Sequence, residues 1–210
     1  MASRDQGRLF EDPTLYSDMG DENDFYETPA WAVELVLPML PQEPCALLEP
    51  AAGRGAILDV LLPCPYVQAA WAVELDPTRH QELARKHPGV SIHRGDFFWM
   101  HHVHQAFQAH PARKLAPLNP PYTKPRETIG LEFVEKCIEL CQPAGFVAAL
   151  LPLAFCTGVE RSERIHDRYP CSVYPFRRRP HFGGDGSGSR DFAWFTFDLL
   201  NPKREWRVIG

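Results

Sequence analysis

The stretch Leu47-Leu-Glu-Pro-Ala-Ala-Gly-Arg-Gly-Ala56 joins a short apolar run to a helical pattern through a loop with two glycines. Gly53 and Gly55 permit a tight turn and a close backbone approach, which a loop that grips a nucleotide-like ligand requires. The stretch lacks both the GxGxxG pattern and a following GK[ST], so a phosphate cradle is not expected. Glu49, at the end of the apolar run, would repel a phosphate and attract a cation or an amine.

Strand and helix patterns alternate along the chain on both sides of this loop. Such alternation is typical of βαβ units around a parallel sheet, and two further strands in the last third are expected to pair antiparallel. A first helix is expected to begin at Pro29, with Thr28 as its N-cap, and to end near Pro41. The seven expected strands cover residues 45–49, 69–74, 90–93, 115–118, 145–151, 171–176 and 192–199, and the other expected helices cover 56–62, 77–87 and 128–141.

Two more strand ends carry acids. Val73-Glu-Leu-Asp76 lies about 20 residues after the glycine loop, where an acid can accept hydrogen bonds from both ribose hydroxyls. Gly95-Asp-Phe-Phe98 follows the next strand, and its carboxylate could meet an adenine amino group. Strand ends favour Gly, Asp and Pro as turn residues in any case. The ordered set of three acids around one glycine loop nevertheless favours an adenosine site.

A fourth strand end carries Asn119-Pro-Pro-Tyr122. The two prolines stiffen the backbone, so the Asn119 carboxamide and the Pro120 carbonyl can converge as acceptors on a planar NH₂ group. Hydrogen bonds to its protons raise the electron density on the nitrogen and prepare it to attack. Tyr122 offers a stacking face for an extruded base and could lie near a cationic methyl donor. Read without its neighbours, the same stretch is a proline-rich turn.

Together these motifs resemble a class I S-adenosylmethionine-dependent methyltransferase of the amino-methylating group that carries the NPPY motif. The resemblance spans residues 25–151 and includes Phe25-Tyr-Glu-Thr-Pro29, which is similar to the extra motif of DNA adenine-N6 methyltransferases. It implies a Rossmann-like, doubly wound α/β sheet of seven strands, mostly parallel with an antiparallel C-terminal strand. It also implies S-adenosyl-L-methionine as the cofactor.

The resemblance implies a role for each motif. Glu49, Gly53 and Gly55 would hold the methionine moiety, Glu74 the ribose and Asp96 the adenine. The catalytic residues would be Asn119, Pro120, Pro121 and Tyr122. The other cofactor contacts would come from Tyr26, Thr28, Pro29, Pro50, Ala51, Leu75, Asp76, Phe97 and again Asn119.

The order of the motifs is similar to the gamma arrangement of small bacterial or phage adenine-N6 enzymes, so adenine N6 in DNA is the leading substrate. Two features depart from that family: Pro117 interrupts the fourth strand, and no full-sized target-recognition domain follows. The alternatives are an amino group of adenine or guanine in RNA, or protein glutamine N5. A catalytically silent nucleic-acid-binding relative is an alternative of another class.

The charge of the chain is unevenly spread. The net charge of −5 argues against a nucleic-acid partner, but residues 1–27 hold eight acids and two bases. Residues 28–210 therefore hold 20 bases and 19 acids, and residues 161–210 hold ten bases and six acids. We expect an acidic disordered leader over residues 1–24 and a single domain over 25–210. The candidate substrate contacts are Tyr122, Lys124, Arg177, Arg178, Arg179, His181, Phe182 and Arg190; a solvated basic turn is the alternative for the arginines.

Several classes of protein and site are excluded. No apolar run approaches the roughly 20 residues that span a bilayer, and the acidic N-terminus is not a secretory signal. The six cysteines form no CxxC pair and are typical of buried thiols in a reducing compartment, so we expect a cytoplasmic protein without membrane contact. His101-His-Val-His104 lacks further ligands at metal spacing, so we expect no metal site and a solvent-facing helix start. The oligomeric state stays open, and a monomer is compatible with the sequence.

Overall fold

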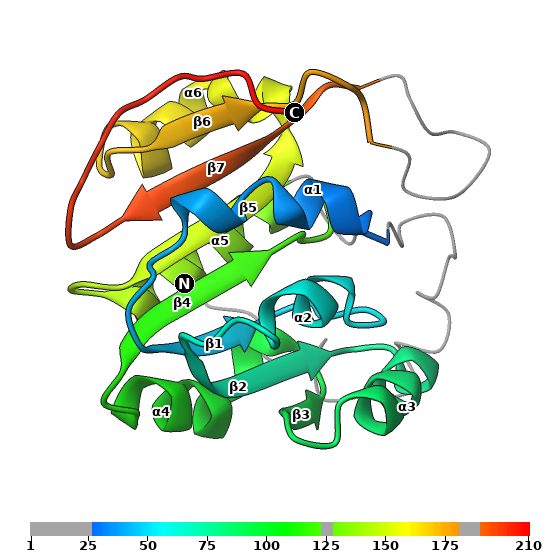
Figure 1. Cartoon of the computed structure of the whole chain (residues 1–210). Helices are drawn as coiled ribbons and strands as arrows, with labels where there is room; N and C mark the ends of the chain where they lie inside the picture. Colours follow the sequence, from blue (N-terminus) through cyan, green and yellow to red (C-terminus); the bar gives the residue numbers. More distant parts are fainter. Residues whose placement is uncertain (1–26, 123–127, 181–189) are drawn as a thin grey trace, which may run out of the picture.

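Seven strands form one mixed sheet in the order β3-β2-β1-β4-β5-β7-β6. The structure, a computed structural model, describes residues 27–122, 128–180 and 190–210 (Figure 1). The expected leader over residues 1–24 lies outside these ranges. Strands β1 (Cys45–Glu49), β2 (Val67–Glu74), β3 (Ser91–Arg94), β4 (Arg113–Leu118) and β5 (Phe146–Pro152) pair in parallel. Strand β7 (Phe192–Asp198) runs antiparallel to both β5 and β6 (Ser172–Pro175), so the expected fold class is confirmed.

Helices cover both faces of the sheet (Figure 1). On one face, α1 (Ala30–Glu34), α2 (Ala56–Leu61) and α3 (Pro77–Lys86) bury apolar side chains against β1, β4 and β5. On the other face, α4 (His101–Ala109) and α5 (Ile129–Cys141) do the same. The short helical turns are η2 (Leu37–Met39), η3 (Phe97–Trp99), η4 (Leu153–Cys156), α6 (Val159–Arg161) and η5 (Ser162–His166). Because β1 and the carboxyl-terminal half of β4 are wholly buried, they read as continuous apolar runs.

The expected start of the first helix is wrong by one residue. Helix α1 begins at Ala30, and Pro29 occupies the N-cap position in an extended conformation. Thr28 therefore does not cap this helix. Its hydroxyl instead accepts a hydrogen bond of 2.9 Å from Asn119 Nδ2, a residue 91 positions away.

The expected environment of the histidine run is only partly right. His101 and His102 are exposed at the start of α4, as expected, but His104 is 4% exposed and packs edge-on against Phe97. Burial lowers the pKa of His104 to about 4, so this ring is neutral at physiological pH. His104 follows the helical period of Val103 and Phe107 toward the core, which explains its burial.

Other sequence-based expectations about the core agree with the structure. Trp194 and Phe195 are fully buried in β7, and the Trp194 indole donates a hydrogen bond of 2.7 Å to the Ala32 carbonyl. All six cysteines are free thiols; four are buried as expected, but Cys64 and Cys156 are only half-buried. A search of the described ranges for a long apolar helix that could cross a bilayer found none.

Gly55 is the N-cap of α2 and has a φ of +82°. An added Cβ would lie 2.7 Å from both His87 Nε2 and Leu83 Cδ1. We expect Gly55→Ala to lower the free energy of unfolding by about 2 kcal/mol, because left-handed strain and overpacking add. Gly89→Ala is the matched control, since nothing lies within 4 Å of its Cβ position; we expect a change within about 0.5 kcal/mol. Urea unfolding measures both, and equal stabilities would contradict the prediction.

Candidate active site

The order of the strands reverses between β1 and β4, and ligands of open α/β sheets bind at such a switch point beyond the carboxyl ends of the strands. The pairing of β1 with β4 stops at Leu47 and Leu115. Two residues further along β4 lies Pro117, which has no N–H to donate to a neighbouring strand. The proline that weakened the strand prediction therefore lies where β4 continues without a hydrogen-bonded partner in β1.

Glu49 is the last residue of β1 and is 2% exposed. Within the described residues its Oε2 atom has no hydrogen-bond partner. Burial raises the pKa of Glu49 well above its usual range, and the nearby carboxylates of Glu74 and Asp59 raise it further. A buried carboxyl with an unpartnered oxygen is costly to a folded protein, so it is expected to meet a donor supplied by a ligand.

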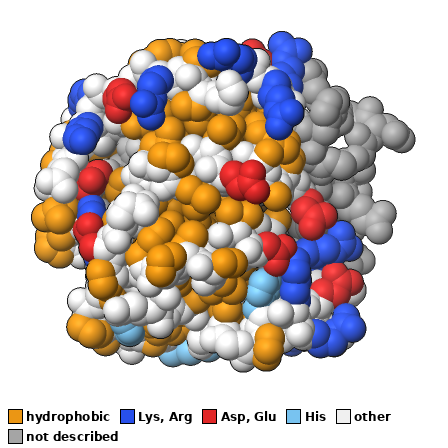
Figure 2. Space-filling view, in the orientation of Figure 1, with side chains coloured by type: hydrophobic (Ala, Val, Ile, Leu, Met, Phe, Trp, Pro, Cys, Tyr) orange, Lys and Arg blue, Asp and Glu red, His pale blue; other side chains and the backbone are white. Residues whose placement is uncertain are grey.

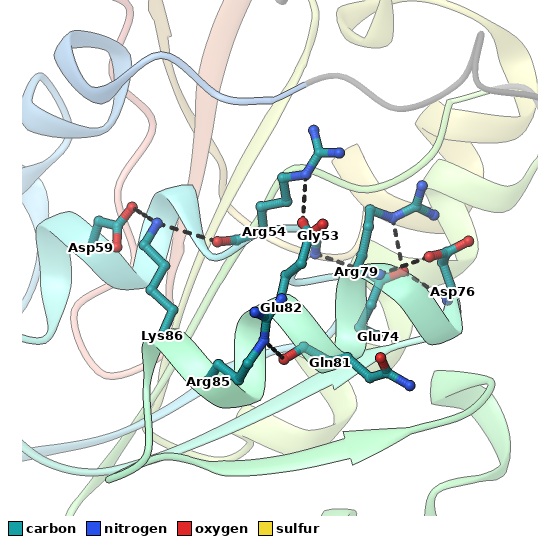
Figure 3. A network of polar contacts seen from close by, with 10 residues as sticks. All are labelled: Gly53, Arg54, Asp59, Glu74, Asp76, Arg79, Gln81, Glu82, Arg85 and Lys86. Carbon is teal, nitrogen blue, oxygen red and sulfur yellow. Dashed lines mark hydrogen bonds and ion pairs between the residues drawn. The ribbon is translucent and has the colours of Figure 1, made fainter.

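The glycine loop is held by β2 and α3 (Figure 3). Glu74, at the end of β2, accepts hydrogen bonds from Gly53 N at 2.7 Å and from Asp76 N at 2.8 Å. Arg79 on α3 lies 3.2 Å from the same carboxylate. The carboxylate of Glu74 therefore fixes the glycine loop and is itself held by a guanidinium. These three hydrogen bonds use both acceptor sites of Oε1 and one of Oε2, so Oε2 can accept one further hydrogen bond, from a single hydroxyl.

The two other acids of the expected adenosine site also stabilise local backbone. Asp76 is the N-cap of α3 and accepts a hydrogen bond of 2.8 Å from Arg79 N. Asp96 is the N-cap of η3 and accepts one of 3.0 Å from Phe98 N. Both acids therefore have a structural role as helix caps. Of the other expected cofactor contacts, Pro50 and Phe97 are buried, Ala51 and Pro29 are half-buried, and Leu75 is exposed.

Asn119 follows β4 and is held at both ends of its carboxamide. Its Nδ2 donates to Thr28 Oγ1, and its Oδ1 accepts a hydrogen bond from the Tyr122 hydroxyl. The Tyr122 hydroxyl also lies 3.3 Å from the Leu150 carbonyl at the end of β5. The segment before α1, the NPPY motif and β5 thus meet at one point. A carboxamide held by both its nitrogen and its oxygen has a fixed orientation at the carboxyl end of β4.

Phe192 lies at the candidate site, but the sequence analysis did not identify it as a site residue. It begins β7, and its ring centroid lies 5.7 Å from that of Tyr122 with a tilt of 55°. Pro120 is buried and Pro121 half-buried, and an added Cβ on Gly130 of α5 would approach the Pro121 carbonyl at 3.3 Å. The contact between Phe192 and Tyr122 joins residues 70 positions apart, so no sequence pattern could have indicated it.

The basic run of residues 177–179 lies at the same end of the sheet as the NPPY motif. Strand β6 runs in the same direction as β5, and the basic run follows the end of β6. Arg177, Arg178 and Arg179 are all exposed. The Arg178 guanidinium lies 4.1 Å from the ring centre of Trp31 on α1, and Arg179 pairs with Asp191 at 2.8 Å. Arg190 is also exposed, and it directly precedes Asp191 in the sequence. Trp31 is the second residue that the sequence alone did not identify.

Four expected site residues lie outside the described residues: Tyr26, Lys124, His181 and Phe182. Their expected roles stay predictions. Among the described residues no group of three or more His, Cys, Asp or Glu side chains is arranged to hold a metal ion.

No protein-family model and no curated protein matches the chain. Solved structures do match. A modification subunit of a putative type I restriction enzyme from Vibrio vulnificus superposes with a TM-score of 0.64 and 14% identity over 92% of this chain and 51% of that one. The type I restriction enzyme EcoKI M protein does so with a TM-score of 0.59 and 19% identity, over 91% and 48%.

A third match is a putative RNA methyltransferase from Pyrococcus horikoshii, with a TM-score of 0.60 and 16% identity over 84% of this chain and 88% of that one. The chain thus spans about half the length of the two modification subunits and most of the length of the third protein. Identities of this size establish the fold alone. The chain therefore has the Rossmann-like fold of class I S-adenosylmethionine-dependent methyltransferases.

Proposed function

We propose that the chain transfers a methyl group from S-adenosylmethionine to an exocyclic amino group, with adenine N6 in DNA as the leading substrate. The observation that carries this proposal is the fixed carboxamide of Asn119, which Thr28 and Tyr122 hold at the carboxyl end of β4. The neighbouring strand β1 ends in the buried carboxyl of Glu49. Asn119 is suited to hold the substrate amine that reacts, and Glu49 is suited to bind the amine of the cofactor.

The residues present fit the cofactor. Glu49 Oε2 has no partner among the described residues, and an α-ammonium group is a donor of the required charge. Gly53 and Gly55 have φ values of +54° and +82°, which allow the tight turn that follows Glu49. S-adenosylmethionine, when bound, supplies a methyl group on a positively charged sulfur. Glu74, Asp76 and Asp96 would hold its ribose and adenine.

The residues around Asn119 would position the amine. Asn119 Oδ1 and the Pro120 carbonyl accept hydrogen bonds from the two amino protons and so raise the electron density on the nitrogen. Tyr122 and Phe192 offer two ring faces, 5.7 Å apart at their centres, against which an extruded base can pack. Positioning of this kind contributes much of the rate in reactions between two bound groups.

A transfer assay decides the substrate. Protein is incubated with methyl-labelled S-adenosylmethionine and, separately, with DNA, RNA or protein, and the modified nucleoside or amino acid is identified after digestion. We expect label in N6-methyl-2′-deoxyadenosine from DNA. RNA is the second candidate, because the chain covers 88% of the putative RNA methyltransferase from Pyrococcus horikoshii. Absence of label from all three fractions, with the cofactor bound, would favour a catalytically silent nucleic-acid-binding protein.

The basic run is the proposed contact for phosphates. We expect the triple variant Arg177→Ala, Arg178→Ala and Arg179→Ala to bind nucleic acid most weakly, relative to wild type, at low salt. The slope of log K against log salt should shrink by about 2 to 3, since each phosphate contact on B-DNA contributes about 0.9. Fluorescence anisotropy over a salt series measures it. Arg85→Ala, on the exposed side of α3, is the control that should leave the slope unchanged; an unchanged slope in the triple variant as well would remove the proposed contact.

A further inference from the structure

The segment after β7 runs back along the outer side of β6 (Figure 1) and makes two isolated parallel bridges with it and the residue after it, Val173–Trp206 and Phe176–Ile209. Val173 N donates to Glu205 O at 2.7 Å, and Arg207 N donates to Val173 O at 3.1 Å. Ile209 N donates to Pro175 O at 2.9 Å, and Arg177 N to Ile209 O at 2.9 Å. The one bond missing from this parallel ladder is the one that Pro175 cannot donate. Residues 205–209 are therefore an edge strand, which we call the C-terminal strand.

Within the described part of the chain, no segment pairs with the outer side of the C-terminal strand. Residues 205, 207 and 209 direct their backbone groups toward β6, so Trp206 and Val208 direct theirs away from it. Among the described residues neither Trp206 nor Val208 has a backbone hydrogen-bond partner. Their side chains are 59% and 50% exposed. An open edge with large apolar side chains is a template for pairing with another strand.

We propose that this edge binds a second copy of the same chain, with the two C-terminal strands antiparallel and Trp206 on the two-fold axis. The outward N–H and C=O groups of Trp206 would then bond those of Trp206 in the second copy. In the same register, Val208 of each copy pairs with Arg204 of the other copy. A two-fold axis makes the contact self-complementary, so the assembly closes at two copies.

Charge favours this register over one centred on Arg207, and Glu205 and Arg207 also lie 3.8 Å apart within one chain. With Trp206 on the axis, Glu205 lies opposite Arg207 of the second copy, and Arg207 opposite its Glu205. Both side chains lie on one face, because the Tyr174 hydroxyl donates to Glu205 at 3.0 Å and the Arg207 guanidinium lies 5.6 Å from the Tyr174 ring centre. Opposite charges directly across two strands stabilise their pairing, and like charges destabilise it. A register centred on Arg207 would place two arginines opposite each other.

Basic side chains are spread along the upper rim of the molecule, with acidic ones among them (Figure 2). Lys203, Arg204 and Arg207 lie close together in sequence at this edge. Glu205 is the acid among them, and in the proposed register the Glu205 carboxylate of the second copy would lie opposite Arg207. A contact of five residues per chain buries less than the roughly 1,200 Å² that marks stable complexes. We therefore expect a weak dimer, populated at about 0.1 mM or above.

Charge reversal tests the pairing. Sedimentation velocity at low salt should show a concentration-dependent dimer for the wild type. Glu205→Arg should raise the dissociation constant about tenfold, because it replaces two opposite-charge pairs by like-charge pairs. The double variant Glu205→Arg with Arg207→Glu should restore the wild-type constant. A monomer at about 0.5 mM, or a dimer that Glu205→Arg does not weaken, would overturn the proposal.

Cross-linking tests the register. Two residues in a hydrogen-bonded antiparallel pair have Cα atoms about 5.5 Å apart, within disulfide range. Trp206→Cys should therefore give a covalent dimer when diamide takes up the two electrons and two protons. Val208→Cys is the matched control: its two copies would lie about 13 Å apart along the strands and should not cross-link above the wild-type background. Equal cross-linking of both variants, or of neither, would overturn the register.

Discussion

Replacement of Asn119 by alanine should abolish methyl transfer while cofactor binding stays largely intact. The substitution removes the acceptor that Thr28 and Tyr122 hold in place, and the loss of a positioned hydrogen-bonding group at a reacting centre lowers rates by about 100-fold or more. The Glu49 carboxyl and the glycine loop on β1 are not altered by it. Label transfer measures the activity, and isothermal calorimetry on the folded variant measures cofactor affinity.

Tyr122→Phe is the control for the Asn119 variant. It removes the hydroxyl that donates to Asn119 but keeps the ring beside Phe192. We expect it to retain transfer within about tenfold of wild type, since one neutral hydrogen bond is lost. A joint loss of cofactor binding and activity in Asn119→Ala would refute the division of roles between β1 and β4.

Glu49→Gln should stabilise the free protein and weaken cofactor binding. The carboxyl is 2% exposed, one oxygen has no partner among the described residues, and burial raises its pKa well above the usual range. Glutamine keeps the shape of the side chain and removes its charge. The free energy of unfolding near pH 8 should therefore rise, by about 1.4 kcal/mol for each unit by which folding raises the pKa of Glu49. Cofactor affinity should fall about 10- to 100-fold, because a hydrogen bond to a charged group is lost.

The pH dependence of the Glu49 variant follows from the sign of the shift. The folded-state pKa of Glu49 lies above the unfolded-state value, so its contribution to stability is fully present below the unfolded pKa and is lost as pH rises through the folded pKa. Wild-type stability should therefore fall relative to Glu49→Gln as pH rises from 5 to 8. An ammonium ligand pairs with the ionised carboxyl, so wild-type cofactor affinity should rise over the same range.

Thermal unfolding and calorimetry across this pH range measure both effects. Glu34→Gln, on the exposed side of α1, is the matched control and should leave stability and affinity unchanged. A Glu49→Gln variant that is less stable than wild type at every pH would show that Oε2 has a partner in the free protein. Unchanged cofactor affinity would remove Glu49 from the binding site.

Much of the fold could be predicted from the sequence, because its elements are short and strongly patterned. Helix α5 was expected over 128–141 and spans Ile129–Cys141, and β5 was expected over 145–151 and spans Phe146–Pro152. Boundaries shifted where a long-range contact competed with local chemistry. Thr28 is a good N-cap by type, yet its hydroxyl bonds Asn119 and the helix begins after Pro29. The pairing of residues 205–209 with β6 had no sequence signal, because it depends on an exposed backbone edge elsewhere in the chain.

The sequence by itself determined which residues stand at the ends of the strands. Parallel strands end at one edge, so motifs that follow them in order must converge there, whatever the side chains do. Only the tertiary structure decided how these side chains are used: that Glu74 holds the glycine loop, that Glu49 keeps an oxygen without a partner in the described residues, and that Arg178 stacks on Trp31. Such contacts join residues tens of positions apart. They depend on the distances between packed elements, and no local pattern of residues encodes those distances.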